Sequence, residues 1–338
     1  MKKIAIVSSC AESCGNAYFT QVLIDSMSAE GYEVECPGLN LFLTQSSNRL
    51  ARKKADRHIE EICTSLKDFD GVNIQFEAGL YGTLPSDITK RLKKLVNANP
   101  NISVTLHSPR LISDSATERE AIKLMLKLRL FKAIKLYFES LRYNISIHLN
   151  QKVVRFLIQK KVNIIVHTER AKEQIELLYG YGNVSVHPLK IVDTNIATNC
   201  NLITSIKKEY RFNNEDKIVG IFGFINEYKG HTLAIRALSH LPKNYKLMFF
   251  GRQHPQTIKN NELVNYYISN LQKVITKEKL EDRVFFMGEY DNEDFVNLAS
   301  SVDFVWLPYV ENGQDGSGIA SIVFDVSKKS TLLFVLCF

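Results

Sequence analysis

Short apolar runs alternate with longer stretches of helical periodicity along most of the chain, and this alternation constrains the fold most strongly. A buried parallel strand reads as roughly four to eight apolar residues, and the helix that follows it is longer. Regular alternation of this kind predicts parallel βαβ units rather than an all-α or all-β fold. In the first half of the chain, strands are predicted over residues 4–7, 72–76, 102–106, 163–167 and 184–187, with a helix over 16–30.

The same alternation restarts in the second half. A length of 338 residues suits two cores better than one. The polar segment 193–216 is interpreted as the linker, and we predict two Rossmann-like domains, 1–195 and 196–338, that face a cleft. The predicted strands here are 217–222, 246–250, 283–287, 304–307 and 331–335, and the predicted helices are 231–241, 262–279, 292–300 and 319–326.

The composition is that of an ordinary globular protein, with 45% hydrophobic residues, 23% charged residues and a net charge of +7. That charge fits nucleic acid, anionic lipid or a phosphorylated ligand. The basic residues are not interleaved with an aromatic platform, which argues against nucleic acid. No apolar run approaches the roughly 18 residues of a membrane span. The apolar run after Met1 is too short for a signal peptide, so we expect a cytoplasmic protein.

The six cysteines show no spacing typical of a zinc site. The sequence predicts free thiols in a reducing compartment. They are Cys10, Cys14, Cys36, Cys63, Cys200 and Cys337.

The region 118–161 is rich in Leu, Ile, Phe, Lys and Arg and has two interpretations. It is either a basic amphipathic helix that rests on anionic lipid, or a helix packed on its own domain with lysines reaching the edge. Amphipathic core helices are common, which favours the second interpretation.

The turn after the 217–222 strand has the features of an anion site. Gly223 removes a side chain where the strand ends, and Lys229 and Gly230 lie where the next helix begins. Amide groups at a helix N-terminus attract anions, and a lysine adds a full charge. This pattern suits a diphosphate, although an ordinary βα turn with a solvated lysine explains it equally well.

A second glycine-rich turn follows the 304–307 strand. Gly316 and Gly318 let the backbone approach a ligand, and Ser317 is suited to bind phosphate. Asp315 is suited to accept hydrogen bonds from sugar hydroxyls. The alternative is a flexible acidic loop. Two such turns at one end of the same sheet reinforce each other.

Three positions in the first half lie at carboxyl ends of predicted strands, where parallel sheets bind ligands. His107, in the segment 105–109, is a candidate contact for a sugar hydroxyl or a phosphate, and a purely structural role is the alternative. His167 occupies a similar place in the next unit. Gly15 permits a tight turn after the first strand.

These segments together resemble the GT-B-fold, retaining glycosyltransferases of group 1, family four. The resemblance runs over nearly the whole chain. It implies a nucleotide sugar bound mainly by the second domain, an acceptor held mainly by the first, retention of configuration, and no metal. The motifs that carry it are Gln75-Phe76-Glu77 with Gly79, Thr105-Leu106-His107-Ser108-Pro109, Val166-His167-Thr168-Glu169, Gly223-Phe224-Ile225 with Tyr228-Lys229-Gly230, Leu307-Pro308-Tyr309, and Ser317-Gly318.

The resemblance also assigns roles. Lys229 matches the lysine that binds the diphosphate, and Asp315 matches the first acid of the family's E-x7-E motif, which holds the donor sugar. The turn 316–318 matches the phosphate contact beside that acid. His107 matches the histidine that approaches the transferred sugar.

Several positions depart from the family pattern. An arginine usual near the lysine is replaced by Phe224 and Asn226, and the second acid of E-x7-E falls on Val323. The chain stops soon after the predicted strand 331–335, where the family usually continues with another βα unit, so a truncated second domain is expected. These departures favour a catalytically impaired GT-B-like binding protein as the alternative function, and an epimerase is a weaker option.

The predicted function is transfer of a hexose-type sugar from a UDP- or GDP-linked donor to a glycan or lipid-linked acceptor. The expected setting is synthesis of a bacterial surface polysaccharide such as lipopolysaccharide or capsule, with the protein at the inner face of the membrane. No separate cofactor is expected.

Overall fold

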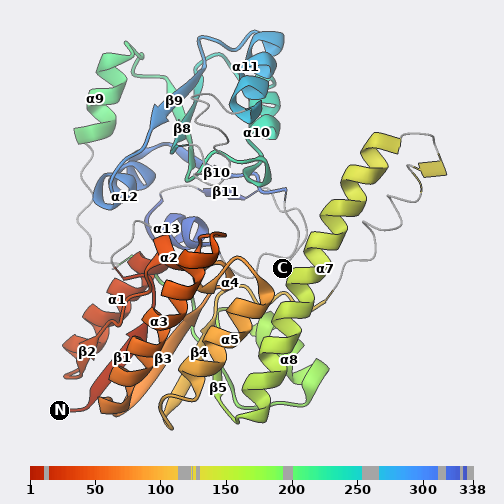
Figure 1. Ribbon diagram of the computed structural model, residues 1–338. Helices are drawn as coiled ribbons and strands as arrows, with labels where there is room; N and C mark the ends of the chain where they lie inside the picture. Colours follow the sequence, from red (N-terminus) through yellow and green to blue (C-terminus); the bar gives the residue numbers. More distant parts are fainter. Residues whose placement is uncertain are drawn as a thin grey trace. The chain divides into compact units, whose positions relative to one another are not determined.

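The computed structural model describes residues 1–10, 15–112, 123, 125–126, 130–192, 201–252, 266–310, 317–327 and 330–332. The chain divides into two compact units, Met1–Leu189 and Lys190–Phe338. Each unit has one parallel sheet with helices packed against it (Figure 1). The first unit ends at Leu189, slightly before the boundary predicted at residue 195.

The first unit is built on a six-stranded sheet with the order β2-β1-β3-β4-β5-β6. Every neighbouring pair is parallel. The strands are β1 (Lys3–Val7), β2 (Glu33–Glu35), β3 (Gly71–Phe76), β4 (Ile102–Leu106), β5 (Asn163–Val166) and β6 (Val184–Val186). Only β2 has no predicted counterpart, because this short edge strand has two exposed glutamates and no apolar run.

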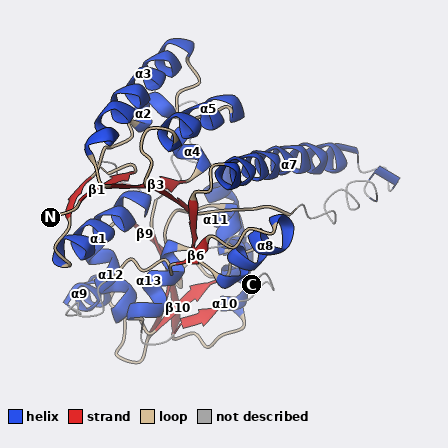
Figure 2. Cartoon of the chain, turned by 90° about the horizontal axis from the view of Figure 1, so that it is seen from below, coloured by secondary structure: helices blue, strands red, loops and turns tan. Residues whose placement is uncertain are grey.

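Helices cover both faces of this sheet. Parallel strands are joined by right-handed crossovers, so the strand order sends α1 to one face and α3 and α5 to the other (Figure 2). The helical segments are α1 (Gly15–Ala29), α2 (Leu41–Thr44), α3 (Arg49–Ser65), η1 (Leu66–Asp68), α4 (Ala78–Tyr81), α5 (Pro85–Val96), α7 (Leu130–Gln159) and α8 (Glu169–Tyr179).

Local side chains define these helices. The Asn48 side chain accepts hydrogen bonds from two amides in the first turn of α3, and the Thr168 hydroxyl caps α8 in the same way. The buried Arg91 on α5 forms an ion pair with Asp56 on α3 at 2.8 Å, which ties the two helices together.

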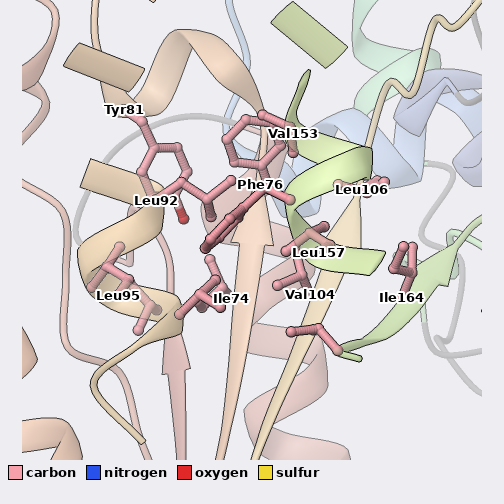
Figure 3. Close-up of a cluster of buried hydrophobic side chains, with 14 of the residues drawn as sticks. Ile74, Phe76, Tyr81, Leu92, Leu95, Val104, Leu106, Val153, Leu157 and Ile164 are labelled. Carbon is pink, nitrogen blue, oxygen red and sulfur yellow. The ribbon is translucent and has the colours of Figure 1, made fainter. Parts of the chain in front are cut away.

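The core of the first unit lies between the sheet and α5 with the second half of α7 (Figure 3). Apolar residues at the carboxyl halves of β3 and β4 meet side chains from both helices there. These residues are Ile74, Phe76, Leu92, Leu95, Val104, Leu106, Val153 and Leu157.

The second unit has a five-stranded parallel sheet with the order β11-β10-β7-β8-β9. Four of the five strands predicted for this half are confirmed, with small shifts at their ends, and the strand predicted at 331–335 is confirmed as far as residue 332, the last that the structure describes. Its elements are α9 (Asn201–Glu209), β7 (Lys217–Phe222), η2 (Glu227–Lys229), α10 (His231–Ser239), β8 (Tyr245–Phe250), α11 (Tyr266–Glu278), β9 (Val284–Gly288), α12 (Asn292–Ser301), β10 (Phe304–Leu307), α13 (Gly318–Val326) and β11 (Ser330–Leu332).

The linker prediction is wrong for part of 193–216. Helix α9 occupies the middle of that segment, and Ile203 and Ile206 on it are buried against the core of the second unit. The helix is short and mostly polar, so two apolar side chains one turn apart were too weak a pattern to predict it.

The prediction of free thiols is wrong for Cys10 and Cys36, which form a disulfide with Cα atoms 6.3 Å apart. The parallel pairing of β1 with β2 continues into a bridge between Ser8 and Gly38, and this brings the two cysteines together. Cys63 is a free thiol. Cys14, Cys200 and Cys337 lie outside the described residues.

Among the described helices, none combines the length and the apolar character needed to cross a membrane.

Candidate functional site

Lys229 connects the two predicted turns of the second unit. Its side chain is only 4% exposed, and its ammonium nitrogen donates a hydrogen bond to the Tyr309 hydroxyl at 2.7 Å. The same nitrogen lies 4.2 Å from the centroid of the Tyr309 ring. The Tyr309 hydroxyl in turn lies 3.1 Å from the Ser317 hydroxyl. Residues from two connections, the one between β7 and α10 and the one between β10 and α13, are therefore linked by consecutive hydrogen bonds.

The chemistry of these three groups determines which one donates and which one accepts in each hydrogen bond. An ammonium only donates, so the Tyr309 oxygen accepts. Burial raises the pKa of Tyr309 to about 12, which keeps its phenol protonated and able to donate to Ser317. The Ser317 oxygen also accepts from the Ala320 amide as the N-cap of α13. The Ser317 hydrogen is then available to an acceptor at the start of α13, a position suited to an anion.

Two glycines allow the loops to meet. Gly230 has a φ of +73°, and a Cβ there would lie 1.8 Å from the Pro308 carbonyl oxygen. Gly223 has a φ of +95°, and a Cβ there would lie 3.8 Å from the Lys229 ammonium nitrogen. Glycine is required at Gly230 because the backbone after β10 passes directly against it. At Gly223 the positive φ favours glycine, and a Cβ would also lie 3.2 Å from the Ile319 side chain.

The second predicted cluster is described only in part. Ser317 is the N-cap of α13, and Gly318 is the first residue of that helix, as the sequence suggested. Asp315 and Gly316 lie outside the described residues. Their contacts with a donor sugar and its phosphates therefore stay predictions.

The positions that depart from the family pattern have local structural roles. The Asn226 side chain caps η2 by accepting from the Glu227 amide, and Val323 is fully buried in the core. The Arg252 guanidinium lies 5.9 Å from the Phe224 ring centroid and forms an ion pair with Glu289 at 3.1 Å. A cation from the end of β8 thus lies beside the loop that lacks the usual arginine.

Tyr309 is the residue of this site to which sequence reasoning assigned no role. The only signal was its place directly after a strand, in the motif Leu307-Pro308-Tyr309. Its contact with Lys229 depends on β10 pairing with β7, and that pairing cannot be read from local sequence.

In the first unit, the structure brings His107 and His167 together. His107 Nδ1 lies 3.1 Å from His167 Nε2, and His107 Nε2 lies 2.7 Å from the Gln75 side chain. The edge of the Phe19 ring packs on both imidazoles. Burial lowers the pKa of His107 to about 3 and also lowers the pKa of His167, so both rings are neutral at pH 7. Both nitrogens of His107 therefore have partners inside this unit.

Gly15 is the first residue of α1, and a Cβ added there would have no atom within 4 Å. Its role beside a ligand therefore stays a prediction. The part of the chain that the structure describes also contains no group of three or more His, Cys, Asp or Glu side chains suited to a metal ion.

We expect His231 to make the stability of the second unit depend on pH. Its ring is buried at the start of α10, and burial, with the nearby positive charge of Lys229, lowers its pKa from 6.5 to about 4. The unfolded chain therefore binds the proton first as the pH falls. The free energy of unfolding should therefore decrease by about 1.4 kcal/mol for each unit by which the pH falls between 6.5 and about 4.

Urea unfolding of the wild type and His231→Phe between pH 7 and pH 4 measures this effect. Phenylalanine preserves the ring contacts with Phe249 and Tyr267, so the variant should lose most of the slope below pH 6.5. His240→Gln is the control, because His240 is the exposed C-cap residue of the same helix α10. Equal slopes in the wild type and His231→Phe would contradict the assignment.

Known proteins resemble this chain in sequence over part of its length and in fold over nearly all of it. Residues 203–321 match the family described as glycosyl transferases group 1. No curated protein matches the sequence. Among solved structures, Anabaena HepE in complex with UDP-glucose superposes with a TM-score of 0.60 at 14% identity, over 98% of this chain and 80% of that one.

Two further structures show the same fold. WaaG, a glycosyltransferase involved in lipopolysaccharide biosynthesis, has a TM-score of 0.57 at 12% identity, over 99% of this chain and 81% of that one. Sucrose-phosphate synthase from Thermosynechococcus elongatus has a TM-score of 0.57 at 14% identity, over 98% of this chain and 81% of that one. The family match covers residues 203–321, which lie in the second unit, and the chain as a whole has the α/β fold of the GT-B glycosyltransferases.

Proposed function

We propose that this protein transfers a hexose-type sugar, with retention, from a nucleotide sugar to a glycan or lipid-linked acceptor during synthesis of a bacterial surface polysaccharide. The observation that carries the donor half of this proposal is the chain of donors from Lys229 through Tyr309 to Ser317 at the start of α13. HepE binds UDP-glucose, and WaaG acts in lipopolysaccharide biosynthesis, which supports the substrate class and the setting.

The proposed mechanism is electrostatic. When the bond between the sugar and the diphosphate breaks, negative charge develops on the leaving phosphate. Lys229, the Ser317 hydroxyl and the amides of the first turn of α13 are fixed in place before the reaction, so they stabilise that charge without reorganising. We assign no protein nucleophile and no cofactor to this step.

Calorimetric titration of the full chain with UDP, GDP and a panel of UDP- and GDP-linked sugars tests this proposal. We expect one nucleotide series to bind and its sugar to be released or transferred. Failure of the folded protein to bind any member would refute the proposal.

A catalytically impaired binding protein is the second candidate. The buried Val323 favours it, because an acid that the resemblance expects to hold the ribose is replaced by a core side chain. Tight binding of a nucleotide sugar with no release of the nucleoside diphosphate over long incubation would support this candidate over the transferase.

We also propose that the first unit contacts an anionic membrane through α7. The second half of this helix packs in the core, as one interpretation of the sequence predicted, while its first half extends away from the unit (Figure 1). Ile134, Tyr137, Phe138, Leu141 and Ile145 are all exposed there. Their spacing puts them on one helix face.

The charge of this region supports an anionic lipid surface as the partner. Residues 121–145 contain six basic residues and one acidic residue. Exposed aromatic and aliphatic side chains beside basic residues are typical of helices that lie in the membrane interface.

We expect Phe138→Glu to weaken binding to vesicles rich in phosphatidylglycerol by about tenfold or more, because it removes an exposed ring that would insert into the lipid and adds a charge that anionic lipid repels. Leu177→Glu is the matched control, since Leu177 is 86% exposed on α8. Vesicle co-sedimentation measures both variants. Equal loss in the two variants, or equal binding to phosphatidylcholine vesicles, would argue against a specific α7 contact.

A further inference from the structure

A disulfide in the first unit joins Cys10, shortly after β1, to Cys36, directly after β2, and the two Cα atoms are 6.3 Å apart. These strands lie at one edge of the sheet, and α1 lies between them in the chain (Figure 1). The bond therefore closes a ring of backbone that contains α1. Both cysteines are half-buried, so a reductant in the solvent reaches them.

The backbone holds β1 and β2 together independently of this bond. The two strands pair in parallel, and a bridge between Ser8 and Gly38 continues the pairing beyond them. The Leu39 amide donates to the Ser8 carbonyl at 2.7 Å, and the Leu39 side chain is buried in the core. Because these contacts lie on both sides of Cys36, two thiols at these positions stay close together. The bond is then able to break and re-form without unfolding the sheet.

Helix α1, inside the ring, contacts the imidazole pair of His107 and His167. The Phe19 ring on α1 is only 2% exposed, and its centroid lies 5.6 and 5.5 Å from the centroids of these two imidazoles. The Thr20 hydroxyl lies 2.7 Å from the Ser8 hydroxyl, in the segment that leads to the disulfide. The position of α1 therefore affects how the two imidazoles are packed.

A disulfide at this place has two possible roles. A permanent bond stabilises proteins of oxidising compartments, whereas the disulfides of a reducing compartment are usually catalytic or redox-sensing. The half-buried cysteines and the strand pairing that stands without the bond favour the second role.

We propose that Cys10 and Cys36 form a redox switch that controls how firmly α1 and the imidazole pair are held. A thiolate of a dithiol reductant attacks one sulfur, the S–S bond breaks, and a mixed disulfide forms. The second thiolate of the reductant then displaces the remaining cysteine sulfur; with glutathione, a second molecule does so. Two electrons and two protons pass to the protein, which gains two thiols, and the reductant becomes a disulfide.

Reduction removes a covalent constraint on the ends of the ring. Non-covalent contacts then hold the start of α1, so local opening of this helix becomes more frequent. The Phe19 ring packs less firmly on His107 and His167 as a result. The switch lies within the first unit and does not depend on the proposed function.

Glutathione buffers of graded ratio test the switch on the native full chain. Free thiols are alkylated, and the peptides that contain Cys10 and Cys36 are identified by mass spectrometry. We expect the bond to open in reducing buffer without denaturant and to re-form in oxidising buffer. Amide hydrogen exchange in α1 should be about tenfold faster or more in the reduced state, whereas exchange in α5 should not change.

The double variant Cys10→Ser with Cys36→Ser imitates the reduced state and should show the fast exchange in every buffer. Cys63→Ser is the matched control, because Cys63 is a free, half-buried thiol of the same unit, and this variant should switch like the wild type. A bond that resists glutathione in the folded chain, or equal exchange in α1 in both states, would overturn the switch. Loss of the fold in the double variant would also overturn it, because the strand pairing would then depend on the bond.

Discussion

Gly230→Ala should destabilise the second unit by about 4 kcal/mol or more, an effect at the high end for a single substitution. A residue other than glycine at its φ of +73° costs about 1 kcal/mol. The new Cβ would also lie 1.8 Å from the Pro308 carbonyl oxygen, so two backbone segments must separate. Movement of Pro308 would displace the neighbouring Tyr309 and weaken nucleotide binding as well.

Gly288→Ala is the matched control for this prediction. Gly288 lies in the same unit and has a φ of +80°, but a Cβ there meets no atom within 4 Å. It should cost about 1 kcal/mol, the strain of the backbone alone. Denaturant unfolding compares the two variants. Equal losses would mean that the close approach of Pro308 to Gly230 contributes nothing to stability.

Lys229→Met should lower the affinity for the preferred nucleotide about 10- to 100-fold, because a charge-assisted hydrogen bond to the diphosphate is lost. Methionine keeps a long apolar chain against the Tyr309 ring, so packing should change little. Lys229→Ala should have the same effect on binding with a larger loss of stability. Calorimetric titration with UDP and GDP measures the change.

Lys246→Met is the control, since Lys246 also lies over an aromatic ring of the second unit, that of Phe212. It should bind nucleotide like the wild type. Tyr309→Phe removes only the hydroxyl that links Lys229 to Ser317 and should give an intermediate loss. Unchanged affinity in Lys229→Met would leave the turn as an ordinary connection between strand and helix.

The strands of both sheets were predictable because burial on both faces of a parallel sheet leaves an uninterrupted apolar run. Two elements, β2 and α9, were not predicted because they lack such a run of buried apolar residues. The edge strand β2, Glu33–Glu35, has no such run, since both glutamates are exposed. Helix α9 buries Ile203 and Ile206, with Leu202 partly buried beside them, in an otherwise polar segment. Elements that bury few side chains leave little periodicity to detect.

The candidate donor site was predictable in part. Gly223, Lys229 and Gly230 stand at a strand-to-helix junction, and that junction is a local feature of the sequence. The link to Tyr309 and Ser317 was not predictable, because it exists only where β10 lies beside β7. The same holds for the imidazole pair of His107 and His167, on neighbouring strands β4 and β5.

By itself, the sequence determined the class of fold and the place of the two turns proposed to bind phosphate, because side-chain periodicity and backbone requirements such as those of Gly230 act over a few residues. Only the tertiary structure decided which turns meet and which thiols pair. These contacts join residues far apart in the chain, and strand order and register bring them together.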